Sequence, residues 1–141
     1  LNINECSIWL KDSLEGLPAS VNNENFVALI KDNINFPHEA QEYLNNLFLT
    51  PLAQREEIIN IIRSAGKEFY LQACDAIPSE ILDWSETTKN IGSITGKKGK
   101  ELFMPLRCAI TGQTKGPELD RVVNLIGTEH VLKKLKEASE L

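Results

Sequence analysis

The sequence is poor in the residues that build metal sites and disulfide frameworks. It has 141 residues with three cysteines and two histidines, and no two cysteines stand in a C-x-x-C arrangement. An odd, widely spaced set of cysteines argues against both a disulfide framework and a zinc site, and it favours a reducing, cytoplasmic compartment. His38 and His130 have no second nitrogen ligand nearby in the sequence. We therefore expect no bound metal and place both histidines on helix surfaces.

Long hydrophobic runs are also missing. The longest apolar stretches, such as residues 26–30, are far too short to span a bilayer, so we expect no membrane partner. The first residues resemble no signal peptide, and a chain that begins with Leu1 suggests a piece of a longer protein. No strand edge is expected to pair with another copy, which favours a monomer.

Negative charge predominates overall but not everywhere. The net charge is −5 at pH 7, whereas nucleic-acid-binding domains usually carry a basic footprint. Residues 97–121, however, contain six basic and three acidic side chains, a net charge of +3, so the rest of the chain carries −8. This asymmetry allows one basic face on an acidic body.

Apolar residues recur at helical spacing along almost the whole chain, without the sustained alternation that is typical of strands. We therefore predict an all-α fold, a multi-helix bundle or cage. The expected helices cover residues 2–15, 24–33, 38–48, 51–64, 67–76, 79–84, 86–94, 98–110, 117–126 and 128–139. Thr50 and Thr128 are predicted to cap the helices that follow them. The break at residues 77–79 divides the chain into two candidate helical subdomains, 1–78 and 79–141, with one undivided domain as the alternative.

Three motifs follow one another in the last third of the chain. K-K-G-K-E-L-F-M-P-L-R-C-A-I-T-G spans residues 97–112, G-P-E-L spans 116–119, and L-I-G-T-E spans 125–129. In this order and spacing they resemble the carboxyl-terminal anticodon-binding region of bacterial glutamyl-tRNA synthetases, which are class I enzymes. The resemblance is strong over residues 97–137; earlier residues agree only in helical character and in Trp84 preceding the lysine-rich stretch.

The resemblance implies a helical domain that recognises the anticodon loop of tRNA for glutamate. The longer enzyme would be a glutamate–tRNA ligase that uses ATP and Mg²⁺, and its catalytic half would be a partner of this domain. The sequence has neither the H-I-G-H-type nor the K-M-S-K-S-type signature of the catalytic fold. We therefore expect no catalytic residue and no cofactor in this chain. Charging of the tRNA for glutamine is left open.

The resemblance also assigns base-reading roles to four residues: Arg107, Gly116, Pro117 and Leu119. Arg107 lies in an apolar run, where an unpaired guanidinium is costly to bury, so its side chain must reach either a carboxylate or the surface. Its planar set of donors suits the base contact that the resemblance implies. A salt bridge that joins two helices is the structural alternative. At the Gly116-Pro117 helix start, free N–H groups can donate, while Glu118 and Asp120 favour a neutral base edge over phosphate. An ordinary helix start explains the same residues.

Basic and aromatic side chains near Arg107 are further candidates. Contacts with the tRNA backbone are expected for Lys97, Lys98, Lys100 and Lys115, with solvated surface as the alternative. Phe103 is the first aromatic to test for base stacking. A core position is expected for Trp9, Phe48, Phe69, Tyr70 and Trp84. Cys108 is expected to be a small buried residue, and Pro105 to bend its helix.

Two other functions stay open on the sequence alone. A helical protein-interaction module without RNA binding would fit the overall negative charge and the weakly matched first hundred residues. An independent enzyme would need a nucleophile with its base or a metal cluster, and the sequence indicates neither.

Overall fold

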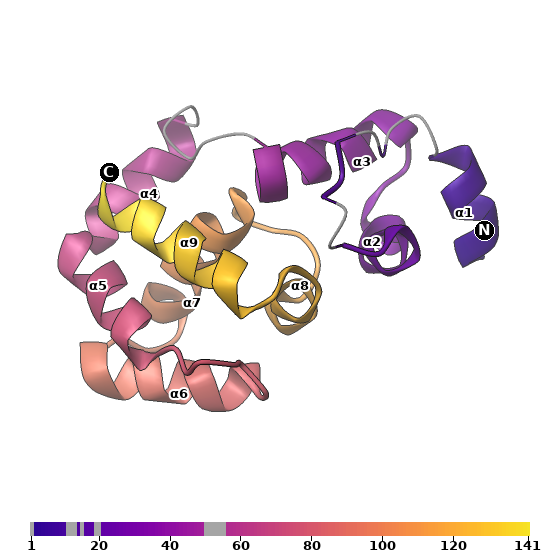
Figure 1. The fold of residues 1–141 in the computed structure, drawn as a ribbon. Coiled ribbons are helices and arrows are strands. Elements are labelled where there is room, and N and C mark those ends of the chain that lie inside the picture. Colours follow the sequence, from indigo (N-terminus) through magenta and orange to yellow (C-terminus); the bar gives the residue numbers. More distant parts are fainter. Residues whose placement is uncertain (1, 11–13, 15, 19–20, 50–55) are drawn as a thin grey trace.

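The computed structural model describes the chain except residues 1, 11–13, 15, 19–20 and 50–55 (Figure 1). Its elements are α1 (Ile3–Trp9), α2 (Asn23–Ile30), the 3₁₀ helix η2 (Lys31–Asn33), α3 (Pro37–Leu44), the π-helix η3 (Asn45–Leu49), α4 (Glu56–Ala65), α5 (Lys67–Ala76), α6 (Trp84–Thr95), α7 (Lys100–Thr111), α8 (Leu119–Ile126) and α9 (Thr128–Ser139). Within the described ranges there are helices and no strands, which confirms the all-α prediction.

Helix bounds agree best with the sequence where breakers flank a periodic segment. The helices predicted at 67–76 and 128–139 match α5 and α9 residue for residue. The prediction of two helices at 79–84 and 86–94 is wrong, because residues 79–83 are not helical and one helix, α6, begins at Trp84. Asp83 sets this start, since its side chain accepts a hydrogen bond from the Glu86 N–H at 3.3 Å. Thr50 lies outside the described residues.

Thr128 does not cap α9 as predicted. The N-cap of α9 is Gly127, with φ +86°. The Thr128 hydroxyl instead accepts a hydrogen bond from the Ile81 N–H at 2.8 Å. This bond ties the segment that precedes α6 to the start of α9.

The helices form two groups that share one hydrophobic core. Figure 1 shows α1–α3 on one side and α4–α9 on the other. α5 packs against α6 and α9, α4 packs against α7, and the two groups meet where α2 contacts α8 and η3 contacts α7. The division at residue 78 stays a prediction about domain organisation; α5 and α6, on either side of that residue, pack against each other.

The aromatic core is mostly where the sequence places it. Trp84, Phe69 and Tyr70 are buried, and Phe48 is half-buried with its ring centroid 6.3 Å from that of Phe26. The side chain of Trp9 lies outside the described residues. A separate prediction, burial of Cys108, is confirmed because its side chain is fully enclosed.

His130 is not a surface residue. It is half-buried, its Nε2 lies 2.9 Å from the carbonyl oxygen of Leu47, and its ring centroid lies 5.3 Å from that of Phe48. A carbonyl oxygen can only accept, so Nε2 carries the proton. Burial lowers the pKa of His130. His38 is exposed, as predicted, and stacks on Phe36.

Candidate nucleic-acid interface

The lysine-rich segment forms the tight turn between α6 and α7. α6 ends at Gly96, which has φ +73° and donates its N–H to the Gly92 carbonyl at 2.9 Å. Gly99, with φ +58°, precedes α7. Because residues with side chains rarely adopt such angles, these two glycines allow the tight turn between the two helices. Lys97 and Lys98 lie at the tip of the turn and are exposed.

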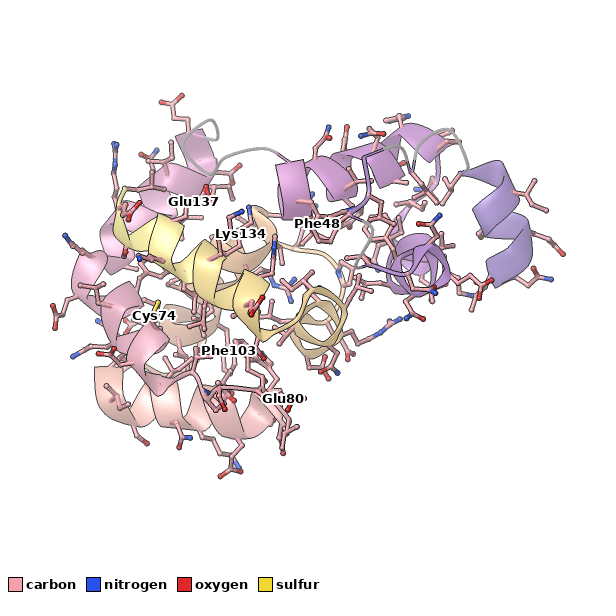
Figure 2. All side chains as sticks on the ribbon, in the orientation of Figure 1. Phe48, Cys74, Glu80, Phe103, Lys134 and Glu137 are labelled. Carbon is pink, nitrogen blue, oxygen red and sulfur yellow. The ribbon has the colours of Figure 1, made fainter. Side chains whose placement is uncertain are left out.

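Arg107 lies farther along α7, about 10 Å along the helix axis from Lys100. It is half-buried, and its Nη1 donates a hydrogen bond to the carbonyl oxygen of Pro117 at 2.9 Å. In the part of the chain that the structure describes, the one ion pair joins Lys134 Nζ to Glu137 Oε2 at 3.8 Å on α9 (Figure 2). The predicted alternative for Arg107, a salt bridge between two helices, is therefore wrong for the described residues.

The start of the α7–α8 loop is held by the hydroxyl group of Thr111 and by a close contact with η3. The Thr111 Oγ1 donates to the Arg107 carbonyl at 2.8 Å and accepts from the Gln113 N–H at 3.1 Å. Gly112 ends α7 with φ +68°, and a Cβ there would lie 3.3 Å from the Asn46 carbonyl oxygen. Gly112 therefore allows both the turn and the close approach of η3.

The end of the same loop lies against α3. Gly116 has φ +145°, and a Cβ there would lie 3.4 Å from both Cε1 and the hydroxyl oxygen of Tyr43. Tyr43 is half-buried; burial raises the pKa of its phenol, while the positive charge of Arg107 opposes that rise. Tyr43, Arg107, Lys115 and Pro117 line the same small cavity. The structure therefore gathers Arg107, Gly116 and Pro117 around one aromatic ring of the first helical group.

The predicted base-reading turn exposes backbone groups to a ligand more than it exposes side chains. Pro117 is buried and Leu119 is 8% exposed, with its side chain in the hydrophobic core. Gly116 is half-buried and has no side chain to cover the backbone. Glu118, the N-cap of α8, makes no side-chain capping bond. The groups available to a ligand at this turn are therefore the backbone around Gly116 and the first turn of α8, together with Arg107.

The predicted phosphate-binding lysines fall into two places. Lys97, Lys98 and Lys100 are exposed at the amino-terminal end of α7, whereas Lys115 is exposed in the loop near Arg107. A groove of about 750 Å³, lined mainly by α4 and α7, includes Lys97, Lys100 and Thr114 in its lining. Its lining also includes Glu57 and Glu101, so the charge of this groove is mixed.

Tyr43 and Asn46 are contacts of the loop that the sequence does not predict. They lie on α3 and η3, more than sixty residues before Gly112 and Gly116. Nothing in the local pattern around Tyr43 indicates these partners, because helical periodicity predicts which face is buried and not what covers it.

The described residues form neither a metal-binding cluster nor a membrane-spanning helix. No group of three or more His, Cys, Asp or Glu side chains in these residues is arranged to hold a metal ion. None of the described helices is long and apolar enough to cross a membrane.

Comparison with known proteins gives a consistent set of similarities. The family described as anticodon binding domain matches residues 9–139. The chain is 38% identical to glutamate–tRNA ligase 1 of Halorhodospira halophila over 118 residues, which are 84% of this chain and 25% of that protein. It is 34% identical to glutamate–tRNA ligase 2 of Nitrosococcus oceani over 113 residues, 80% of the chain and 24% of that protein.

A third relative matches over more residues. Glutamate–tRNA ligase 1 of Rickettsia bellii is 35% identical over 129 residues, which are 89% of this chain and 27% of that protein. The chain therefore spans about a quarter of the length of these relatives. No solved structure matches the chain significantly.

Proposed function

The chain belongs to the anticodon-binding domain family, and from that premise we propose that it recognises the anticodon loop of tRNA for glutamate. In this proposal it acts as the carboxyl-terminal domain of a glutamate–tRNA ligase, as the names of its relatives suggest. Unpaired loop bases are splayed out and read on their edges, which is the usual mode of sequence-specific RNA recognition.

The observation that carries the proposal is the hydrogen bond from Arg107 to Pro117. One N–H of the guanidinium is used to hold the loop carbonyl, and the others have no hydrogen-bond partner among the described residues. The planar guanidinium is thereby oriented at the turn with donors left for a base edge or a phosphate oxygen. Arg107 thus positions the loop and reads a base with the same side chain.

The turn from Gly116 to Leu119 supplies the second part of the site. Gly116 lets Tyr43 pack closely against the turn, since a Cβ there would lie 3.4 Å from the Tyr43 ring, and Pro117 and Leu119 hold the turn by being buried. In this proposal the base contacts the backbone of Gly116. Glu118 and Asp120 are both exposed near the first N–H groups of α8. Their negative charge favours a neutral base edge over a phosphate at that helix start.

The lysines contribute affinity without sequence preference. Lys97, Lys98 and Lys100 at one end of α7, and Lys115 near Arg107, contact phosphates of the loop and stem in this proposal. Such contacts release counterions whatever the neighbouring base is.

The remaining parts of the proposal concern the longer enzyme. ATP and Mg²⁺ bind its catalytic half, which docks with this domain; the residues of this chain do not fit either group, because the sequence has no H-I-G-H-type or K-M-S-K-S-type signature. We propose that the enzyme is cytoplasmic. We also propose that this domain is a monomer. Whether the tRNA for glutamine also binds depends on the geometry at one or two anticodon positions.

Binding to anticodon stem-loops tests the proposal directly. Filter binding of the 141-residue chain is measured over a series of salt concentrations, with the cognate stem-loop and with loops changed at each anticodon base. We expect tight binding that weakens with salt and that prefers the cognate loop by about 1 to 3 kcal/mol at a directly read base. A helical protein-interaction module without RNA binding would show neither the salt dependence nor the preference.

A further inference from the structure

A second groove, between α6 and α7, is basic although the chain as a whole is acidic. Its volume is about 620 Å³, and its lining includes three lysines, Lys89, Lys97 and Lys98, and the ring of Phe103. No carboxylate belongs to the described residues that line it. The net charge of the chain is −5, so this local charge favours a negatively charged ligand.

Three glycines shape this groove, which we call the Phe103 groove. A Cβ at Gly92 would lie 3.1 Å from the Lys97 carbonyl oxygen, so the lysine-bearing turn packs directly on the backbone of α6. A Cβ at Gly96 or Gly99 would meet nothing within 4 Å. The turn therefore leaves open space beside its lysines, and a ligand can approach the backbone there.

Phe103 is an exposed aromatic residue in the lining of this groove. Its side chain, labelled in Figure 2, is 46% exposed, unlike the buried aromatic residues of the core. It precedes Arg107 by four residues on α7. Residues four apart lie one above the other on a helix, about 6 Å between their Cβ atoms. Phe103 and Arg107 are therefore neighbours along one strip of the α7 surface.

We propose that the Phe103 groove binds one unpaired nucleotide of the RNA loop, different from the base read by Arg107. The base stacks on the ring of Phe103, and Lys89, Lys97 and Lys98 contact the flanking phosphates. This inference rests on the proposed function, because it takes the loop on Arg107 as the source of the nucleotide. A stacking platform beside a basic groove is how proteins hold single-stranded nucleic acid without reading its sequence. An acidic peptide would pair with the lysines but would leave the aromatic face unused.

Abasic loops combined with variants of Phe103 test this inference. Fluorescence anisotropy measures the affinity of the 141-residue chain for the anticodon stem-loop, with each loop nucleotide in turn made abasic. For the wild-type chain we expect about a tenfold loss at one position outside the base read by Arg107. Phe103→Leu should weaken binding of the intact loop about tenfold. In this variant the abasic nucleotide at that position should cause no further loss of affinity, because two changes that delete the same contact are not additive. Phe103→Trp, which keeps an aromatic face, should retain the affinity.

Matched controls separate stacking from general effects. Phe36→Leu removes the ring of another exposed phenylalanine, which lies before α3 and stacks on His38, and it should leave the affinity unchanged. Lys89→Ala should weaken binding of all loops alike and reduce the salt dependence of the affinity. Lys133→Ala on α9 should have neither effect. Thermal melting of each variant confirms that the fold is retained.

The possible outcomes distinguish this inference from the proposed function. The inference is wrong if Phe103→Leu binds every loop as tightly as the wild-type chain does. It is also wrong if the affinity of this variant falls by the same factor at every abasic position, because the groove then holds no stacked base. Displacement of RNA by an oligoglutamate peptide, dependent on Phe103, would also overturn it. If the wild-type chain does not distinguish anticodons but Phe103→Leu still weakens binding of an unpaired RNA strand, the proposed function fails and the nucleotide site stands.

Discussion

Arg107 and Pro117 are joined by one hydrogen bond, from Nη1 to the backbone carbonyl, at 2.9 Å. The bond links the middle of α7 to the turn that precedes α8, and the cavity around it also includes Tyr43 of α3. A substitution at Arg107 therefore affects two properties, the position of the loop and the donors offered to a base.

We predict that Arg107→Ala weakens binding of the cognate stem-loop by about 1 to 3 kcal/mol and reduces the preference among bases at one anticodon position. The reason is the loss of a bidentate donor that no other described side chain at the turn replaces. Competition binding with altered loops measures both effects.

Arg121→Ala is the matched control for that experiment. Arg121 also donates to a backbone carbonyl, that of Ala28, with its Nη2 at 3.0 Å. Its loss should lower stability to a similar degree without changing base preference. If Arg107→Ala instead weakens all loops evenly, Arg107 binds phosphate and does not read a base.

We predict that Lys98→Ala and Lys100→Ala weaken binding of the cognate loop and of altered loops equally. Both lysines are exposed, and each lost phosphate contact should reduce the slope of log affinity against log salt by about 0.7 to 0.9. Binding titrations at several salt concentrations measure this slope. A change in base preference with an unchanged slope would assign these lysines to the bases.

We predict that Gly116→Ala destabilises the fold more than Gly66→Ala does. Both positions have positive φ, +145° and +91°, so both substitutions strain the backbone, by about 1 to 3 kcal/mol. Only the Cβ at position 116 also meets a neighbour, Tyr43 at 3.4 Å, whereas none lies within 4 Å at position 66. Urea unfolding of the two variants gives the difference, and Gly116→Ala should also weaken stem-loop binding. If both variants bind the stem-loop with equal affinity, the position of the α7–α8 loop does not affect RNA binding.

We predict that the free energy of unfolding falls as the pH is lowered through the range just below about 6.5. Burial lowers the pKa of His130 in the folded chain, so the unfolded chain takes up the proton first and is favoured by acidification. The loss levels off once the pH passes below the folded pKa. Urea unfolding at about pH 7.5 and about pH 5.5 measures the difference.

Histidine substitutions assign that pH dependence. His130→Gln should remove much of it, whereas His38→Gln should not, since His38 is exposed. An unchanged pH dependence in His130→Gln would mean that other groups cause it.

The sequence by itself determined the helices with strong local signals and the segment that carries the family resemblance. α5 and α9 follow from apolar spacing and from the residues that break a helix at their ends. These signals act between residues three or four apart, so they are present in any window of the chain. The order of the P-L-R and G-P-x-L motifs likewise needs no tertiary structure.

The tertiary structure alone decided which partners the buried and polar groups have. His130 turns inward to Leu47, Thr128 binds the Ile81 N–H, and Gly116 lies against Tyr43. In each case the partners are more than forty residues apart, and their contact depends on how helices pack across the core. Periodicity predicts which face of a helix is buried, but it does not predict the element that covers that face, because any apolar surface of suitable shape satisfies the same pattern.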